Sequence, residues 1–479
     1  MFTILDGVGL RDEEKYNAFK QASTPNFDYL WNNYPHSRLD ASGKDVGLPF
    51  GQMGNSETGH LNIGAGRVVF QPLELINNKI ETGEFFTNKC FLELIKYAKE
   101  NNKKMHLIGL ISDGGVHSHI NHLKALLKLV NDNGLYPYMH LITDGRDTLT
   151  DSGYGYVKEI SDLNIGSIVS ICGRYYTMDR DKNFDRTLKG YNLMVNGEGK
   201  KYNDIRSLFE DTYNNKVYDE FIKPSLLDNN GLIEKDDAVI WFNFRPDRGI
   251  QINKKLMEHT NHIVTMMPVS DEITVPYAFH LEELKNTLGE YLSKNGIHQL
   301  RIAETEKYAH VTYFFDGGID VEYEKCDRIL IPSPKVPTYD LKPEMSAYLI
   351  TDELLKKLEN YDIVILNFAN CDMVGHTGNM DATIKAVEEV DYNLGRIYNK
   401  CKDLGYTLIV TADHGNCELM ADDNGNIITS HTTNKVPFIV CENNIRLKDG
   451  RLGDIAPTIL KVMDLEIPNE MTGKVLIDE

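Results

Sequence analysis

The chain has 479 residues, 41% of them hydrophobic and 25% charged, which is typical of a folded protein long enough for two or more domains. Its formal net charge of −20, with no basic run, excludes nucleic acid as the expected partner but leaves room for a locally positive site that binds a small anion. We expect a cytoplasmic protein without membrane contact, because there is no secretory signal and no apolar run of membrane-helix length. The seven scattered cysteines argue against a disulfide framework.

Short apolar, β-branched runs alternate with polar turns and helix-like stretches along the chain. This pattern predicts an α/β fold with mostly parallel sheets covered by helices. The expected strands are residues 2–5, 105–111, 139–143, 168–172, 238–244, 299–302, 362–368, 407–411 and 436–441. Apolar residues at three- and four-residue spacing predict helices over 281–295 and 345–358. In such sheets ligands bind beyond the carboxyl ends of the strands, so the residues that follow each strand are the candidates for a site.

A glycine-rich stretch, residues 51–67, carries Ser56 among five glycines. Glycine permits positive φ and close approach of the backbone to a ligand, so we expect an exposed serine on a loop. Ser56 is a candidate nucleophile if a base or a metal activates it and positive charge holds its substrate. The alternative is a plain surface loop with a solvated serine.

The strand ends nearest the two termini carry carboxylates and histidines. The candidate ligands are Asp6, Asp372, His376, Asp413, His414 and His431. Asp and His without Cys suit Mn²⁺ or Zn²⁺, and the set is large enough for two ions that could activate Ser56. Taken singly, an Asp-x-x-x-His spacing is weak and an Asp-His-Gly after a strand is often a turn. The remaining candidates His36, His60 and His140 lack this context, and we interpret them as structural or surface histidines.

The strand ends in the middle of the chain carry arginines instead. The candidate substrate-binding residues are His117, Arg146, Asp147, Arg174, Arg180, Arg245 and Arg248. Arginine offers planar, bidentate donors for carboxylate and phosphate, so this group predicts an anion site. Asp147 is a plausible acid/base group for a substrate hydroxyl, or else the ion-pair partner of Arg146. Lys307, after the run 299–302, would place positive charge near a transferring phosphoryl group, or else pair with Glu304 or Glu306 at the surface.

These two groups of strand ends predict one α/β domain built from both termini with a second α/β domain inserted into it. We place the metal-binding domain that carries the serine at 1–70 and 281–479, and the substrate-binding domain at 71–280. The chain would cross between them near 68–75 and near 271–280, and these linkers would act as hinges for domain closure.

The motifs also resemble a known family. They occur in the order Leu-Asp6-Gly, Gly-Asn-Ser56-Glu-Thr-Gly-His, Ser-Asp-Gly-Gly-Val-His117-Ser-His, Asp-Gly-Arg146-Asp147, Gly-Arg174-Tyr-Tyr-Thr-Met-Asp-Arg180, Phe-Arg245-Pro-Asp-Arg248, Glu-Lys307-Tyr-Ala-His, Asp372-Met-Val-Gly-His376-Thr-Gly, Thr-Ala-Asp413-His414-Gly-Asn and Ser-His431-Thr. Together they closely resemble the cofactor-independent phosphoglycerate mutase family of the alkaline phosphatase superfamily, over essentially the whole chain. The sequence departs from the family in having only five residues before Asp6 and Val8 where the family has a tryptophan.

The resemblance implies a reaction and a role for each residue. The enzyme would interconvert 3-phosphoglycerate and 2-phosphoglycerate in glycolysis and gluconeogenesis, with Ser56 taking the phosphoryl group and returning it to the other hydroxyl of the bound glycerate. It implies two Mn²⁺ ions, one held by Asp372, His376 and His431, and the other by Asp6, Ser56, Asp413 and His414. Lys307 would steady the phosphoryl group, the middle residues would hold the substrate with Asp147 as proton carrier, and the enzyme would be a monomer.

Two alternatives remain open from the sequence. Another metal-dependent phosphatase or a phosphopentomutase of the same superfamily would share Ser56 and the metal ligands but not the five middle arginines. A non-catalytic scaffold with the same fold would have lost ligands, whereas each position proposed here is chemically competent.

Overall fold

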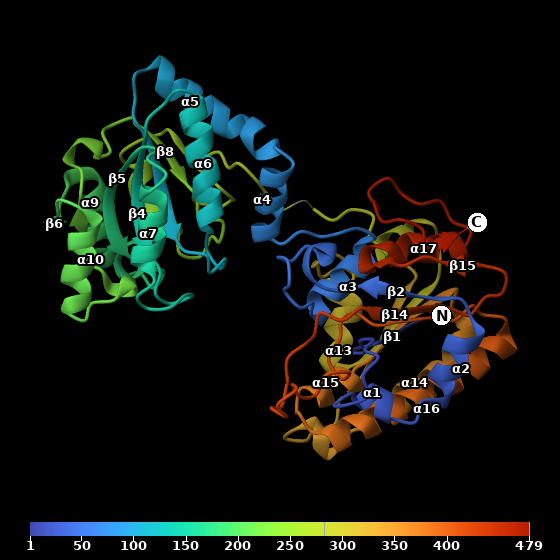
Figure 1. The fold of residues 1–479 in the computed structure, drawn as a ribbon. Helices are drawn as coiled ribbons and strands as arrows, with labels where there is room; N and C mark the ends of the chain where they lie inside the picture. Colours follow the sequence, from blue (N-terminus) through green and yellow to red (C-terminus); the bar gives the residue numbers. More distant parts are fainter. Residues whose placement is uncertain (282, 479) are drawn as a thin grey trace. The chain divides into compact units, whose positions relative to one another are not determined.

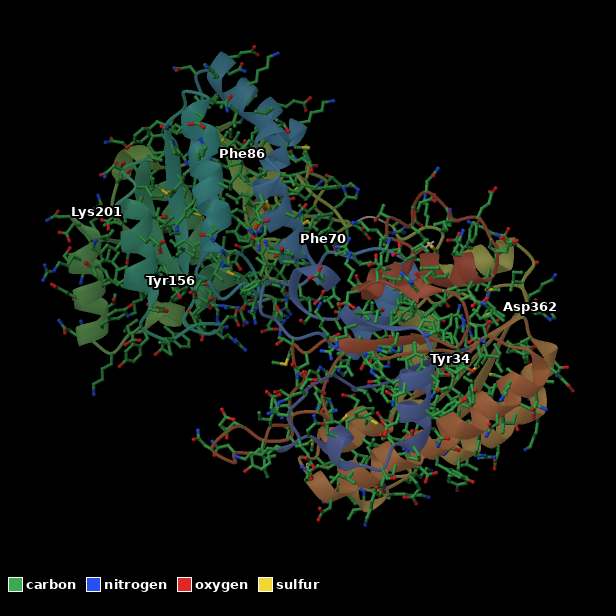
Figure 2. The ribbon with its side chains drawn as sticks, turned by 45° about the vertical axis from the view of Figure 1, so that its right-hand side comes forward. Tyr34, Phe70, Phe86, Tyr156, Lys201 and Asp362 are labelled. Atoms are coloured by element: carbon green, nitrogen blue, oxygen red, sulfur yellow. The ribbon has the colours of Figure 1, made fainter. Side chains whose placement is uncertain are left out.

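The chain folds into two compact units. The structure, a computed structural model, describes residues 1–281 and 283–478. Contacts divide the chain into unit 1, which combines Met1–Phe70 with Glu282–Glu479, and unit 2, which is Gln71–Leu281 (Figure 1). Tyr34 and Asp362 mark unit 1 in Figure 2, and Tyr156 and Lys201 mark unit 2. The functional meaning of this division stays a prediction.

Unit 1 is built on a mixed sheet. In the described residues the sheet has eight strands in the order β11-β10-β12-β1-β13-β14-β2-β16. Their bounds are β1 Phe2–Leu5, β2 His36–Asp40, β10 Gln299–Glu304, β11 Cys326–Ile331, β12 Ile363–Phe368, β13 Ile409–Thr411, β14 Val436–Val440 and β16 Gly450–Arg451. The pairs on either side of β1 are parallel, and β14 pairs antiparallel with both β13 and β2. A small separate ribbon pairs β15 (Arg446–Leu447) with β17 (Ile477–Asp478).

The short strand β1 lies in the middle of this sheet. Phe2 pairs with both Ile365 of β12 and Ile409 of β13. All four residues of β1 are buried, because helices cover both faces of the sheet. The carboxyl ends of the parallel strands therefore bring the residues after β1, β12 and β13 to one edge.

The helices of unit 1 form two layers. One group contains α1 (Ala18–Gln21), α2 (Pro25–Asn33), α14 (Ala347–Lys357), α15 (Asn370–Gly375) and α16 (Met380–Leu404). The other contains α3 (Ser56–Ala65), α12 (Leu288–Lys294) and α17 (Ile455–Val462), and α13 (Thr305–Ala309) runs directly into a π-helical turn, His310–Phe314. In Figure 1 the sheet lies between α14 and α16 on one side and α3 and α17 on the other.

Unit 2 holds a second, mostly parallel sheet. Among the described residues its order is β6-β7-β5-β4-β3-β8-β9, with only β5 and β7 antiparallel. The strands are β3 Met105–Ile111, β4 Pro137–Thr143, β5 Ser167–Gly173, β6 Lys200–Lys201, β7 Ser225–Leu226, β8 Ala238–Trp241 and β9 Ile263–Thr265. The helices are α4 Pro72–Glu81, α5 Lys89–Glu100, α6 Ile120–Asp132, α7 Gly153–Ser161, α8 Arg174–Thr177, α9 Phe184–Asn196, α10 Ile205–Asn214 and α11 Ile250–Met257.

In strands β3 and β8 of unit 2, successive residues point into different cores. Leu107 of β3 belongs to the cluster that contains α5 and α6, whereas its neighbour Ile108 packs in the cluster that contains α11. Ile240 and Trp241 of β8 divide in the same way. Because both faces are buried, these strands read as continuous apolar runs in the sequence.

The predicted α/β class is confirmed, and all nine expected strands are present, most of them with ends shifted by up to three residues. The helix expected over 281–295 is wrong in its first part, since α12 begins only at Leu288, and residue 282 lies outside the described residues. The sequence does not predict strands β2, β9 and β11 or the two-residue strands. None of the described helices combines the length and the hydrophobicity needed to cross a bilayer.

Candidate active site

Ser56 begins a helix instead of lying on a loop. The stretch 51–67 is expected to be an exposed loop, but its second half is α3, and Ser56 is 6% exposed. Asn55 caps the helix, because its side chain accepts a hydrogen bond from the Thr58 backbone N–H at 2.8 Å. Gly59 is required by packing: a Cβ there would lie 2.7 Å from the carbonyl oxygen of Asp413. The helix N-terminus therefore directs its partial positive charge at the Ser56 position.

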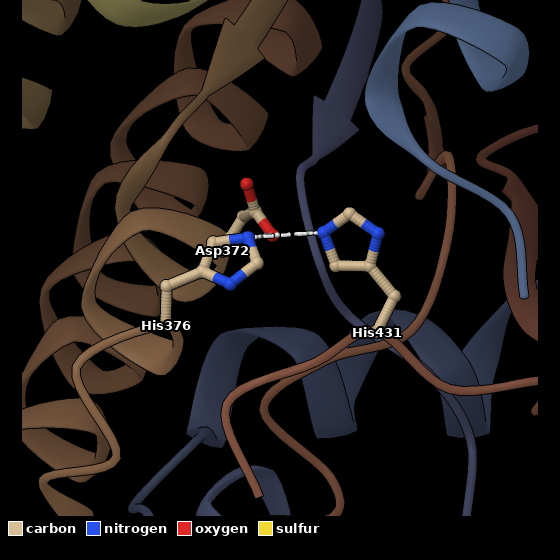
Figure 3. A group of neighbouring side chains, drawn as sticks. All are labelled: Asp372, His376 and His431. Carbon is tan, nitrogen blue, oxygen red and sulfur yellow. Dashed lines mark hydrogen bonds and ion pairs between the residues drawn. The ribbon is translucent and has the colours of Figure 1, made fainter. Parts of the chain in front are cut away.

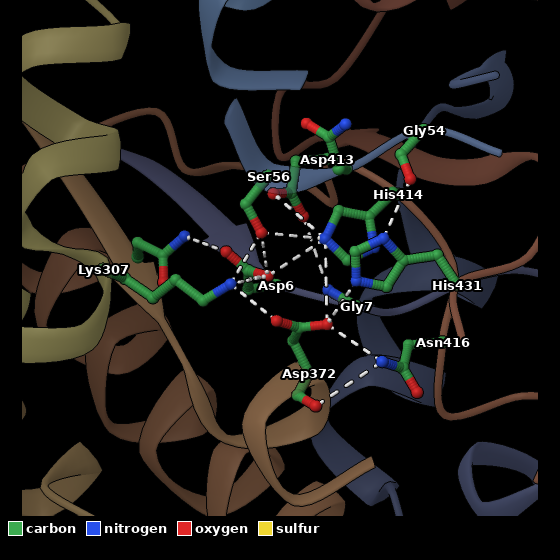
Figure 4. A network of polar contacts seen from close by, with 12 residues as sticks. Asp6, Gly7, Gly54, Ser56, Lys307, Asp372, Asp413, His414, Asn416 and His431 are labelled. Atoms are coloured by element: carbon green, nitrogen blue, oxygen red, sulfur yellow. Dashed lines mark hydrogen bonds and ion pairs between the residues drawn. The ribbon is translucent and has the colours of Figure 1, made fainter. Parts of the chain in front are cut away.

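The hydroxyl of Ser56 lies in a buried polar network at the carboxyl edge of the unit 1 sheet (Figure 4). Its Oγ is 3.1 Å from Asp6 Oδ1 and 2.9 Å from His414 Nε2. Lys307 Nζ donates to Ser56 Oγ at 2.6 Å, to Asp6 Oδ1 at 2.8 Å and to Asp372 Oδ2 at 2.6 Å. Burial alone would lower the pKa of Lys307, but the two carboxylates raise it overall, so the amine is charged.

Glu304 and Glu306 are not the partners of Lys307. Glu304 accepts hydrogen bonds from Ser333 and the Ser346 backbone, and Glu306 accepts one from the Tyr339 hydroxyl. The alternative of a surface ion pair for Lys307 is therefore wrong.

Asp372, His376 and His431 form a first group of converging donor atoms (Figure 3). Asp372 Oδ1 lies 3.2 Å from Nε2 of each histidine, and the two Nε2 atoms are 3.0 Å apart. His376 Nδ1 lies 2.6 Å from the Thr429 carbonyl oxygen, and His431 Nδ1 lies 2.9 Å from that of Gly54. With both Nδ1–H groups donated to carbonyls, the two Nε2 lone pairs face one another, which is favourable when a cation lies between them.

A second group of donors surrounds Ser56. Its buried members, which share Asp372 with the first group, are Asp6, His60, Asp372, Asp413 and His414. Burial opposes protonation of His414, but the carboxylates of Asp413, Asp372 and Asp6 raise its pKa to about 10. Within the described chain, Asp413 Oδ2 accepts no hydrogen bond, although His60 Nδ1 lies 3.2 Å away.

The residues present fit divalent cations. Three buried carboxylates converge with one lysine as their permanent cation, and an orphaned carboxylate oxygen faces the group. Such a set of oxygen and imidazole donors suits Mn²⁺ or Zn²⁺.

Residues that the sequence analysis does not assign to the site support these ligands. His60, interpreted above as structural or surface, lies inside the site: its Nδ1 is 2.8 Å from the Ser56 carbonyl oxygen and its Nε2 is 3.0 Å from Asn367 Nδ2. The buried Glu418 accepts hydrogen bonds from the backbone N–H groups of Gly9 and Asn416, at 3.0 and 2.9 Å. It also accepts from Thr432. Only His60 had a local signal, namely its position one helical turn after Ser56.

In unit 2, Arg174 holds two carboxylates. Its Nη1 lies 2.6 Å from Asp144 Oδ1 and 2.6 Å from Asp147 Oδ2, and its side chain is 3% exposed. Asp147 therefore pairs with Arg174, and the alternative partner Arg146 lies instead 3.6 Å from a carboxylate oxygen of Glu220.

The other predicted substrate-binding residues of unit 2 lie near Arg174. A cavity of about 270 Å³ is lined by Arg146, Arg174, Arg180 and Arg248. Arg186 also lines it, stacked at 4.0 Å over the ring of Tyr175, and is a residue that the sequence does not single out. His117 and Asp147 come close together, with 3.9 Å between His117 Nε2 and Asp147 Oδ2. Arg245 and Arg180 are joined through Asp247.

A buried serine at a helix N-terminus, among Asp and His groups able to hold cations on an α/β sheet, defines a metal-dependent enzyme of the phosphatase type. The family model of the Metalloenzyme superfamily matches residues 1–467, and the chain belongs to it.

Curated relatives of known name identify the family within this superfamily. The 2,3-bisphosphoglycerate-independent phosphoglycerate mutase of Clostridium novyi (strain NT) is 50% identical, over 99% of this chain and 98% of the relative. That of Clostridium perfringens (strain SM101 / Type A) is 48% identical, over 100% and 99%. A crystal structure of Leishmania mexicana phosphoglycerate mutase at low cobalt concentration is 30% identical with a TM-score of 0.55, covering 100% of this chain and 97% of that one. The chain is a member of the 2,3-bisphosphoglycerate-independent phosphoglycerate mutase family.

Proposed function

We propose that the protein interconverts 3-phosphoglycerate and 2-phosphoglycerate through a phosphoserine at Ser56, without 2,3-bisphosphoglycerate. The observation that carries this proposal is the environment of Ser56 Oγ, which lies within 3.1 Å of Asp6, His414 and Lys307 in a buried site. Membership of the family supports the same reaction. We place this glycolytic and gluconeogenic step in the cytoplasm and expect a monomer.

Two divalent ions, which we expect to be Mn²⁺, would be held by the converging donors. One would take Asp372, His376 and His431, and the other Asp6, Ser56, Asp413 and His414. When bound, such ions neutralise phosphoryl oxygens and favour the ionised form of a nearby hydroxyl.

The chain itself supplies the remaining parts of the nucleophile's environment. Ser56 at the first turn of α3 lets the helix dipole stabilise a phosphate on its side chain. Lys307 Nζ, 2.6 Å from Ser56 Oγ, would donate to the oxygens of the phosphoryl group as charge passes to and from the serine. Because the site is buried, water has little access to the phosphoserine.

Unit 2 would bind the glycerate. The arginines that line its cavity offer donors for the carboxylate and the phosphate. Asp147 would carry the proton between the two hydroxyls of the glycerate, and Arg174, 2.6 Å from its Oδ2, would hold its carboxylate in place.

The decisive experiment measures turnover of 3-phosphoglycerate without added 2,3-bisphosphoglycerate, before chelation, after it, and after return of Mn²⁺. Loss on chelation and recovery with Mn²⁺ are expected. Ser56→Ala should abolish turnover, and the matched Ser293→Ala, in α12, should leave it unchanged. Full activity in metal-free protein, or in Ser56→Ala, would contradict the mechanism. Hydrolysis of simple phosphate monoesters or turnover of pentose phosphates, with none of 3-phosphoglycerate, would favour the phosphatase or phosphopentomutase alternative.

A further inference from the structure

Asp247 occupies the centre of the arginine group in unit 2. It follows β8 in the segment Arg245-Pro-Asp-Arg248. Its Oδ2 accepts a hydrogen bond from Arg180 Nη1 at 2.7 Å, and its Oδ1 lies 3.2 Å from Arg245 Nε. Burial opposes ionisation, but Arg180 and Arg245 lower the pKa of Asp247, so the group is a carboxylate. One side chain of this protein thus holds two arginines that the substrate is expected to need.

The hydrogen bonding of the Asp247 carboxylate is incomplete. Oδ1 is buried, yet no hydrogen-bond donor in the described residues satisfies it. Besides Arg245, His117 also faces Oδ1, but its Nδ1 is 3.8 Å away, too far for a hydrogen bond. His117 is 3% exposed, and its Nδ1 also lacks a partner in the described structure. A buried polar atom without a partner costs free energy, so the free site retains unused binding capacity.

His117 adds to this capacity as a neutral group. Burial, together with the charge of Arg174, lowers the pKa of His117 to about 4. A neutral imidazole can donate from Nδ1 to an anionic oxygen without a second positive charge having to be buried. An oxygen placed between Arg180, Arg245 and His117 would contact all three, whereas in the described structure Asp247 hydrogen-bonds Arg180 but neither Arg245 nor His117.

We propose that Asp247 is an internal stand-in for the substrate: it holds Arg180 and Arg245 in the free protein, and an anionic group of the phosphoglycerate displaces it on binding. This inference rests on the proposed function, because it assigns the displaced position to that substrate. Exchange of one carboxylate for another anion at a partly exposed site, where the side chains of Asp247, Arg180 and Arg245 are 29, 45 and 47% exposed, costs little.

The stand-in also explains how closely spaced arginines stay in place without ligand. Arg180, Arg174 and Arg146 all disfavour further positive charge at Arg248, whose pKa is lowered by burial and by these neighbours. Asp247 offsets part of that repulsion in the free protein, beside the carboxylates that hold Arg174 and Arg146. It also competes with the bound anion, so it weakens substrate binding and favours product release.

The test is the affinity of variants that lack this charge. In Ser56→Ala protein, which binds without turning over, calorimetry measures the dissociation constants of 3-phosphoglycerate and of inorganic sulfate. Adding Asp247→Asn should tighten both by about tenfold, about 1.4 kcal/mol. Glu220→Gln is the matched control: it removes the same charge from the same cavity, but Glu220 lies 3.6 Å from Arg146 and holds neither Arg180 nor Arg245. It should tighten binding by less than threefold.

A second readout separates this role from a structural one. With Ser56 intact, Asp247→Asn should lower KM about tenfold and should not raise kcat, because tighter binding slows release. Weaker or unchanged binding, or an equal effect of Glu220→Gln, would overturn the proposal. Asp247→Ala repeats the test if the asparagine variant unfolds. Failure of Ser56→Ala to bind 3-phosphoglycerate at all would count against the proposed function instead, and the sulfate titration would still decide the role of Asp247.

Discussion

Lys307 is the most informative residue to change, because its amine contacts the nucleophile and two carboxylates at once. Replacing it by methionine keeps the length and apolar stem but removes the charge from a side chain that is 3% exposed. Asp6 and Asp372 then lose a partner at 2.8 and 2.6 Å, and Ser56 Oγ loses a donor at 2.6 Å. Stability and catalysis should therefore both fall.

In Lys307→Met, the loss of stability and the loss of catalytic rate should differ in size and in their response to metal. Removing one member of a buried ion pair costs about 3–5 kcal/mol in the free energy of unfolding. Bound cations would neutralise the same carboxylates, so the loss should shrink when Mn²⁺ is present, and the variant should bind Mn²⁺ more tightly than the original protein. Loss of a preorganised, charged donor to the transferring group should reduce kcat by about 10²- to 10³-fold even in saturating Mn²⁺.

Chemical unfolding with and without Mn²⁺, and steady-state assays at saturating Mn²⁺, measure these effects. Lys357→Met is the matched control, because its lysine pairs with Glu353 at 2.8 Å but is 43% exposed. This control should change the free energy of unfolding by less than about 1 kcal/mol and leave kcat unaltered. If Lys307→Met kept the original kcat, the assigned role at the phosphoryl group would be refuted. If it lost equal stability with and without Mn²⁺, the carboxylates it contacts would not be metal ligands.

Three further changes test the packing around the site. Burial raises the pKa of Glu304 to about 7, above its ordinary 4.5, so stability should fall as pH rises between these values. Denaturant unfolding should then find Glu304→Gln stabilised by up to about 3 kcal/mol at pH ~8 and little changed at pH ~4. Glu418→Gln should weaken Mn²⁺ binding about 10- to 100-fold in direct titrations, because Glu418 joins the loops that carry the ligands. Gly64→Ala should cost about 3 kcal/mol in a thermal or denaturant melt, since its Cβ would lie 1.9 Å from the Phe315 carbonyl oxygen.

Each of these three predictions would be contradicted by a specific result. An unchanged pH dependence of stability in Glu304→Gln would show that this carboxyl ionises normally. Glu418→Gln with the original Mn²⁺ affinity would make the shared carboxylate irrelevant to the ligands. Gly64→Ala with full stability would require the π-helical turn to move away freely.

Most of the longer strands in the two sheets can be predicted from the sequence. Residues 105–111 are expected as a strand and form β3, because a strand buried on both faces must be a continuous run of apolar residues. The helix expected over 281–295 fails at its start for a local reason. Asn286 has a φ of 52°, which a right-handed helix does not permit, so α12 begins after it. The spacing of apolar residues predicts which face of a helix is buried, but it does not predict where the helix begins.

The sequence by itself determines the chemical parts of the candidate site: a serine among glycines, Asp and His after the terminal strands, and arginines after the middle ones. Tertiary structure decides what those parts contact. It places Ser56 at the start of a buried helix, brings His60 beside Asp413, and pairs Arg180 with Asp247. Residues that lie hundreds of positions apart meet only because parallel strands bring their carboxyl ends to one edge. Local patterns in the sequence carry no record of such long-range pairing.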